Sequence, residues 1–334
     1  MKTQNIRRFI TARLTGTAQA LAPRLSPGVI DVLERGVARA GPFVPVLGRM
    51  VADNLRAMGM YSPQTHRDYF AYAAAHLAGV LRVFRYADRE GATAGRMHPE
   101  LDRFVRERIL LDDTFDRLRE AAAPGRGVVL LGVHASNYML VLARINQELP
   151  ITVYLRHSRD PRKQEAKRAW CRATGLDFIA EPPDILNPAR RAEVMADALR
   201  QGRILIITPD LAQKREDGVP VRWLDREVYL PGGPAALSLL VEAPLVTVLA
   251  RPAGDGAIRL VFYGPVSPCV TQRRKGWRQE ATRERLQWFA DLMVDEFLRP
   301  CPALWFLWGD KRWTRVFRGD SRYTRRLQEL RTEN

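Results

Sequence analysis

Short apolar runs alternate with longer helical stretches through the central part of the chain. Six runs have the length of a strand: 127–133, 151–155, 176–180, 204–208, 245–250 and 258–262. Stretches with helical character lie between several of them, at 138–148, 161–174, 189–201 and 234–242. Strands that alternate with helices indicate βαβ crossovers. We therefore predict an α/β fold with a central, mostly parallel sheet flanked by helices on both faces.

The first third of the chain has a different pattern. Residues 28–40, 66–85 and 99–121 read as helices, with Pro63, Gly91 and Pro99 between or before them. We predict a helical N-terminal region over 1–122, an α/β core over 123–318 that forms one continuous domain with these helices, and a basic tail over 319–334. A long helix at about 278–298 precedes a tryptophan-rich stretch that ends the core.

Residues 1–24 carry apolar side chains at spacings of three and four, with arginines on other faces. This pattern predicts a basic amphipathic helix, which either lies on an anionic bilayer or packs on the domain. The sequence holds no run of about 18 apolar residues and no signal-peptide pattern. We therefore expect neither a transmembrane helix nor a secretory leader.

The 334-residue chain has a formal net charge of +16. This excess favours an anionic partner, such as membrane lipid, a phosphorylated glycolipid, an acidic carrier protein or nucleic acid, or it is a plain solvated surface. Because zinc-finger spacing, an RNP-like motif and a clear helix-turn-helix are absent from the sequence, nucleic acid is an unlikely partner. The three cysteines contain no CxxC pair, which argues against a metal site or a disulfide framework.

His134 stands directly after the first apolar run of the core and before the helical stretch at 138–148. Ligands of open α/β sheets bind at the carboxyl ends of the strands. An imidazole there can take a proton from an attacking hydroxyl or amine. A lone histidine is more often structural, so its sequence context decides.

Residues 132–139 resemble the motif Gly-x-His-x-Gly-Asn-Trp-Glu of a known enzyme family in several positions. Asn137 and the aromatic Tyr138 match, whereas Ser136 replaces a glycine and Met139 replaces the acid.

Three further blocks follow in order along the chain. One strand ends in Pro209-Asp210, a segment at 219–251 contains a Val-Pro turn and a Gly-Pro-Ala helix start, and the last block is the tryptophan-rich stretch 305–313. Over about residues 45–315, the four blocks together resemble the lysophospholipid acyltransferase superfamily, and most closely its bacterial lipid A acyltransferase branch.

The resemblance implies transfer of an acyl group from acyl carrier protein or CoA to a hydroxyl or amine of a lipid, glycolipid or other acceptor. It implies no metal and no bound organic cofactor. The acceptor would be an anionic lipid or glycolipid at the cytoplasmic face of the bacterial inner membrane. The protein would be peripheral on that membrane surface, or cytoplasmic.

The resemblance also implies roles for individual residues. His134 matches the general base, Arg156 a basic position that contacts the donor or the developing oxyanion, and Asp210 an acid that binds substrate or supports the site. Asn137 and Tyr138 fall in the substrate-binding part of the motif. Non-functional interpretations remain open: Arg156 is then an ordinary surface arginine, and Asp210 is an ordinary loop residue after a strand.

Gly232 and Gly233 precede the predicted helix at 234–242. They either let backbone N–H groups approach a phosphate or thioester oxygen, or simply start the helix.

Met139 cannot hold the charge that a histidine base needs beside it. Loss of the carboxylate in a serine-protease triad costs about 10⁴ in rate. Three outcomes are open. Another carboxylate, such as Asp210, Asp112 or Asp113, replaces it; a backbone carbonyl orients the ring; or acyl transfer is lost and the fold serves as a lipid-, acyl- or partner-binding protein. A carboxylate oxygen within about 3.2 Å of His134 would favour the enzyme.

Overall fold

The computed structural model describes residues 21–87, 96–158, 160–182, 187–266 and 276–327. Its centre is a seven-stranded sheet in the order β1-β9-β8-β2-β5-β3-β4. Neighbouring strands are parallel except β8 and β9. The predicted α/β class with a mostly parallel sheet is confirmed. The strands are β1 (Ile109–Leu111), β2 (Val128–Leu131), β3 (Ile151–Leu155), β4 (Asp177–Ala180), β5 (Ile204–Ile207), β8 (Leu245–Pro252) and β9 (Ile258–Val266).

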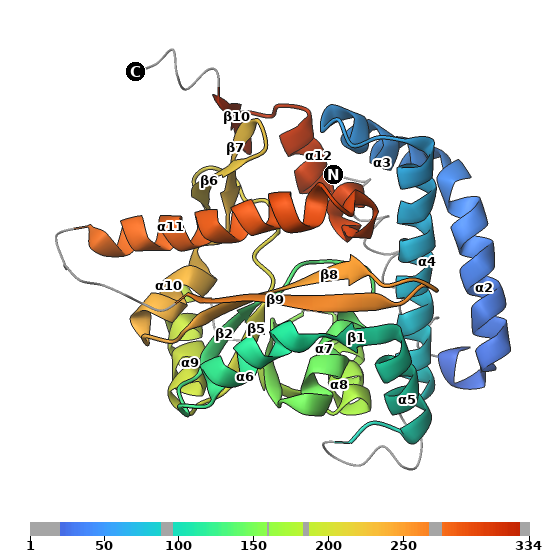
Figure 1. Ribbon diagram of the computed structural model, residues 1–334, viewed down its shortest axis with the longest axis horizontal. Coiled ribbons are helices and arrows are strands. Elements are labelled where there is room, and N and C mark those ends of the chain that lie inside the picture. The colour runs from blue at the N-terminus through green and yellow to red at the C-terminus, as the bar shows by residue number, and fades with distance from the viewer. Residues whose placement is uncertain (1–20, 88–95, 159, 183–186, 267–275, 328–334) are drawn as a thin grey trace.

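Helices cover both faces of this sheet (Figure 1). Connections through α6, α7 and α8 run one way along the strand order, and those through α9 and α10 run back, so right-handed crossovers put the two sets on opposite faces. Strands β2 and β5 lie side by side where the direction reverses, the place where open α/β sheets bind ligands. These helices are α6 (Asp116–Ala122), α7 (Tyr138–Glu148), α8 (Pro161–Thr174), α9 (Pro188–Arg200) and α10 (Gly233–Leu240).

The N-terminal helices form a layer beside the sheet, with α2 on the outer edge and α4 inside it (Figure 1). Serine caps followed by proline start both helices, since Ser26 accepts from the N–H of Val29 and Ser62 from that of Thr65. This layer comprises η1 (Ala22–Arg24), α2 (Pro27–Ala40), η2 (Gly41–Phe43), α3 (Pro45–Ala57), α4 (Pro63–Arg85) and α5 (Pro99–Arg108).

A smaller antiparallel sheet and the C-terminal helices complete the domain. The sheet has the order β10-β7-β6, from β6 (Val219–Trp223), β7 (Arg226–Leu230) and β10 (Thr324–Arg326). The helical elements are α11 (Trp277–Leu292), the π-helical η4 (Met293–Leu298), the 3-10 turns η5 (Pro302–Leu304) and η6 (Phe306–Gly309), and α12 (Lys311–Phe317). Four fully buried tryptophans, Trp223, Trp305, Trp308 and Trp313, pack together where these elements meet.

The structure differs from the expected organisation in two places. The helix expected over 99–121 is interrupted by β1 and by the turn η3 (Asp113–Phe115), because Asp112 caps that turn and the apolar residues before it pair with β9. The central sheet therefore begins before residue 123. Strand β10 lies within the stretch expected to be a basic tail and pairs with β7.

The helix predicted over 1–24 falls mostly outside the described residues, apart from Leu21 and the turn η1. None of the helices in the described ranges is long and apolar enough to cross a membrane.

Candidate active site

His134 and Asp210 follow adjacent strands at equivalent places. Leu131 at the end of β2 pairs in register with Ile207 at the end of β5, and each of the two polar residues comes three positions later. The Nδ1 atom of His134 lies 2.5 Å from Oδ1 of Asp210, and the backbone N–H of His134 donates to Oδ2 at 2.8 Å. Asp210 therefore supplies a carboxylate that residue 139 lacks.

Asp210 is fully buried, and two tryptophans of the C-terminal region donate hydrogen bonds to this residue. The indole N–H of Trp305 donates to Oδ2 at 3.1 Å, and that of Trp313 donates to the backbone carbonyl of Asp210 at 2.8 Å. A buried polar side chain needs such hydrogen-bond partners. The tryptophan-rich stretch thus holds the acid that contacts His134.

The electrostatics of this pair favour a protonated imidazole. Burial lowers the pKa of His134, but the charge of Asp210 and its hydrogen bond to the ring outweigh this, so the pKa is raised above its ordinary value. The carboxylate at Nδ1 holds the proton there in the neutral ring and leaves Nε2 as the basic nitrogen. About one-fifth of the His134 side chain is exposed, so a substrate can reach it.

Three hydrogen bonds fix the backbone around His134. Its carbonyl accepts from the N–H of Phe306 at 2.8 Å. Ser136, two residues further along the loop, donates its N–H to the carbonyl of Leu304 at 2.9 Å and its hydroxyl to the carbonyl of Tyr72 at 2.6 Å. The imidazole is therefore held by supports from α4 and from the C-terminal region, as a preorganised site requires.

Asn137 makes the turn from this loop into α7. Its φ of 58° is left-handed, a conformation that asparagine tolerates better than most residues. The side chain is buried, and its Oδ1 lies 2.8 Å from the place that a Cβ on Gly79 of α4 would take. No side chain caps α7, and the N–H of Leu140 donates to the carbonyl of Asn137 at 2.8 Å. Within the described residues, the N–H groups of Tyr138 and Met139 are left without an acceptor at this helix start.

An aromatic cluster lies beside His134. The ring of Tyr138 meets it edge-on, with centroids 5.7 Å apart, and stacks on His76 of α4 at 5.0 Å. His76 also contacts Phe306, with centroids 5.1 Å apart. Burial lowers the pKa of His76 to about 4, and the nearby charge of His134 adds to this, so His76 is neutral at pH 7. Met139 is partly buried and packs against the hydrophobic core.

His76 carries no signal in the sequence that marks it as a site residue. It stands in an alanine-rich helical stretch far from the motif, and only the packing of α4 against α7 brings it to the site.

A comparison with known families gives this site a context. A family model described as bacterial lipid A biosynthesis acyltransferase matches residues 92–315, more than half of the chain. The chain belongs to this family. The matched region includes His134, Asp210 and both tryptophans that hold the acid. A search of curated proteins found no match.

Membership in this acyltransferase family confirms the resemblance drawn from the four sequence blocks. It makes the protein a relative of lipid acyltransferases and points to enzymatic activity in general terms.

Other residues expected at an acyltransferase site lie farther from His134. Arg156 is exposed after β3, which is separated from β2 by β5, so the two backbones are two strand spacings or roughly 10 Å apart. A Cβ on Gly232 would lie 2.7 Å from a methyl of Val219, which gives this glycine a packing reason.

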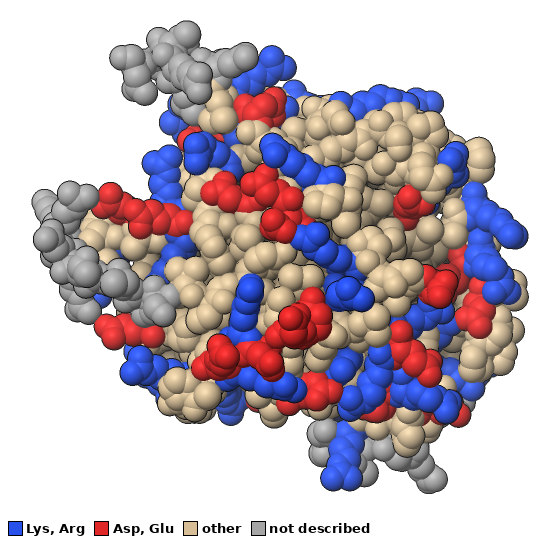
Figure 2. Space-filling model, viewed as in Figure 1, with Lys and Arg blue, Asp and Glu red and all other residues tan. Residues whose placement is uncertain are grey.

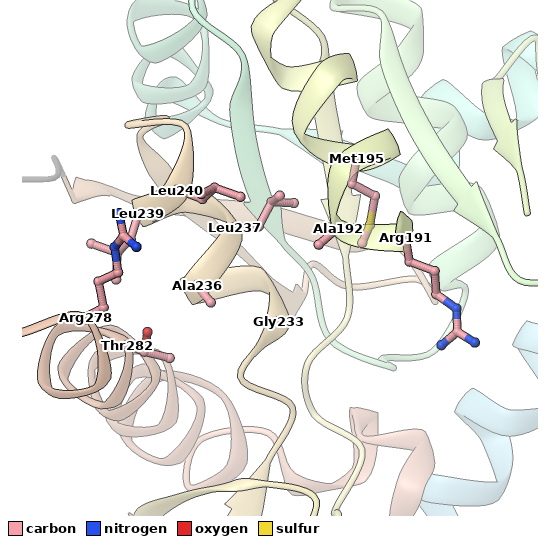
Figure 3. Close-up of a pocket in the computed structure, with 10 residues that line it drawn as sticks. All are labelled: Arg191, Ala192, Met195, Gly233, Ala236, Leu237, Leu239, Leu240, Arg278 and Thr282. Atoms are coloured by element: carbon pink, nitrogen blue, oxygen red, sulfur yellow. The ribbon is translucent and has the colours of Figure 1, made fainter. Parts of the chain in front are cut away.

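Gly233 lines a pocket of about 390 Å³ between α9, α10 and α11 (Figure 3). Apolar side chains such as Met195 and Leu237 form its walls, and Arg191 and Arg278 lie at opposite ends. None of the described residues that line it belongs to the His134 site. The structure thus brings His134, Asp210, Asn137 and Tyr138 together and leaves Gly232 and Gly233 apart from them.

Within the described ranges, no group of three or more histidine, cysteine, aspartate or glutamate side chains is arranged to hold a metal ion.

Proposed function

We propose that the protein transfers an acyl group from a thioester of acyl carrier protein or CoA to a hydroxyl or amine of a lipid or glycolipid, with His134 as the general base. The observation that carries this proposal is the 2.5 Å contact between His134 Nδ1 and the buried carboxylate of Asp210. Such a carboxylate fixes the imidazole tautomer and stabilises the imidazolium, which the thioether of Met139 cannot do.

The reaction begins when Nε2 of neutral His134 takes the proton of the acceptor. The acceptor oxygen or nitrogen bonds to the thioester carbonyl carbon, and the carbonyl electron pair moves onto oxygen. The N–H groups of Tyr138 and Met139, at the start of α7, are suited to stabilise this oxyanion. As the intermediate collapses, the carbon–sulfur bond breaks, and the thiolate leaves with the proton returned by His134.

Positive charge near the end of β3 suits an anionic donor. Lys167 donates from Nζ to the carbonyl of Arg156 at 2.6 Å. Burial lowers the pKa of Lys167, and the charges of Arg156 and Lys163 lower it further, which indicates that several cations share this edge. Because Arg156 lies roughly two strand spacings from His134, it is better placed for a donor phosphate than for the oxyanion.

We place the reaction at the cytoplasmic face of the inner membrane, with the protein peripheral to it. A nucleic-acid binder would need a continuous basic surface. The face shown in Figure 2 instead carries acidic and basic side chains interleaved.

An acyl-transfer assay with a panel of acyl-CoA and acyl carrier protein thioesters and lipid acceptors tests the proposal. The wild type should turn over, and His134→Ala should lose activity because the base is gone. Met139→Glu is the third arm. Turnover that appears only in Met139→Glu would support the alternative function, a disarmed family member that binds lipid or acyl chains. Equal turnover in the wild type and in His134→Ala would refute the role of His134.

A further inference from the structure

Helix α2 turns its apolar side chains toward solvent and its acids toward the protein. Val29, Val32, Leu33 and Val37 recur at spacings of three and four, and each is between 37% and 59% exposed. On the inner side, Asp31 and Glu34 both pair with Arg82 of α4. A helix of a water-soluble surface normally has the opposite arrangement.

The exposed apolar surface continues past the end of α2. Phe43 is 82% exposed and Val46 is 80% exposed, with Val44 and Leu47 beside them. Of the twelve large hydrophobic side chains exposed in the described part of the chain, ten lie within residues 21–77. Single exposed hydrophobics need no explanation, but a gathering of this kind marks an interaction surface.

Exposed arginines border this surface. Arg35 and Arg39 lie on the exposed part of α2, Arg24 comes just before it, and Arg49 follows on α3; all four are exposed. The two acids of α2, Asp31 and Glu34, both pair with Arg82 of α4, which offsets part of their charge. An apolar stripe bordered by arginine is typical of a helix that lies in the interface of an anionic bilayer.

The same surface borders the elements that hold His134. A Cδ1 of Leu47 lies 3.3 Å from the place of a Cβ on Gly309, at the end of η6. In that turn Phe306, itself 37% exposed, donates its N–H to the carbonyl of His134. Leu77, next to His76 on α4, is 41% exposed. Leu77 and Phe306 thus place exposed apolar side chains beside residues of the site.

We propose that this α2 docking surface, formed by Val29, Val32, Leu33, Val37, Phe43, Val44, Val46 and Leu47, seats the protein on an anionic lipid bilayer with the His134 site at the interface. The purpose of docking, access to a lipid acceptor, rests on the proposed function. The docking itself is inferred from the exposed apolar side chains and the arginines beside them.

A bilayer suits this surface better than a second copy of the chain does. In a two-fold dimer each surface meets itself, so the arginines that border one copy would face those of the other. Anionic headgroups instead attract each exposed arginine while the acyl region takes the apolar side chains.

Co-sedimentation of the full-length protein with vesicles tests the docking without requiring turnover. Vesicles of phosphatidylcholine alone are compared with vesicles that also contain phosphatidylglycerol. Wild type should bind the anionic vesicles more tightly. Phe43→Asp/Val46→Asp should bind roughly a hundredfold more weakly, because two side chains lose their burial in lipid. Arg35→Glu/Arg39→Glu should lose roughly thirtyfold or more on anionic vesicles only.

Leu240→Asp is the matched control, since Leu240 is 48% exposed on α10, outside the docking surface, and its variant should bind as wild type does. Thermal melts confirm that each variant is folded. If Phe43→Asp/Val46→Asp binds vesicles as tightly as wild type does, the proposal is overturned and docking belongs to another part of the chain. If the wild type is a dimer, and this variant is a monomer that still binds vesicles as wild type does, the surface is an interface between two copies and the proposal is also overturned. Because binding is the readout, an inactive enzyme would leave this result interpretable.

Discussion

Replacement of Asp210 by asparagine removes the charge beside His134 and keeps the shape of the side chain. In the wild type, Oδ1 faces Nδ1–H of His134, and Oδ2 accepts both the backbone N–H of His134 and the indole N–H of Trp305. Every neighbour of the carboxylate is thus a donor. An asparagine must present its own NH₂ group to one side, so either orientation sets donors against each other.

The less costly orientation can be worked out from these contacts. If the amide nitrogen takes the Oδ2 side, it opposes two fixed N–H groups, one from the backbone and one from a fully buried indole. If it takes the Oδ1 side, the imidazole relieves the conflict by moving its proton from Nδ1 to Nε2. We expect the second arrangement. It leaves Nε2 without a lone pair for the acceptor, and the matching change in a serine-protease triad lowers the rate by about 10⁴.

The assay is thioester-dependent acyl transfer under saturating donor, with wild type and Asp210→Asn compared at the same fraction folded. Because the carboxylate is buried, the variant should also be less stable, so melting curves set the assay temperature. We expect kcat to fall by about 10³ to 10⁴. A variant that keeps kcat within tenfold of wild type, with the tryptophan contacts intact, would show that Asp210 does not orient the base.

Three further predictions concern the same region. The apparent pKa of the acid limb of the kcat/KM pH profile should lie above the ordinary histidine value of 6.5, because His134 must be neutral to act as a base and its pKa is raised in the wild type. In the pH profile of Asp210→Asn, this apparent pKa should be lower. The pKa of His76 is lowered from 6.5 to about 4 in the folded protein, so protonation of the unfolded chain destabilises the fold as the pH falls from 6.5 toward 4. Between pH 7 and 4, the free energy of unfolding of the wild type should therefore drop by up to about 3 kcal/mol more than that of His76→Phe. Gly79→Ala should destabilise by about 1–3 kcal/mol in urea unfolding, since the new Cβ would lie 2.8 Å from Oδ1 of Asn137; unchanged stability would show that α4 can shift.

The sheet could be predicted from the sequence because its central strands β2, β5 and β8 are nearly continuous apolar runs, buried on both faces over most of their length. The missed strands lack this signal. The three residues of β1 follow directly on a helix, and β6 contains Pro220 and the exposed Arg222. Such short segments are extended because they pair with a partner strand, and the local sequence pattern does not show which strand that is.

The contact between His134 and Asp210 could be suspected from the sequence but not chosen over Asp112 or Asp113. All three acids follow or border strands, and the choice depends on strand order. Only the neighbour relation of β2 and β5 sets Asp210 beside the imidazole, whereas Asp112 follows β1 at the edge of the sheet and caps the turn η3. The indole bonds to Asp210 join residues about a hundred positions apart, a separation that no local pattern encodes.

The position of Met139 now has a physical explanation. Asp210 already occupies Nδ1, and three N–H groups hold its carboxylate in place, two from His134 and one from Trp305. A glutamate at 139 would have to displace it to reach the same nitrogen, and that would leave buried donors unpaired. We therefore expect Met139→Glu to turn over no faster than wild type in the acyl-transfer assay. A gain of tenfold or more would mean that Asp210 supports the fold and that the reaction needs its acid from α7.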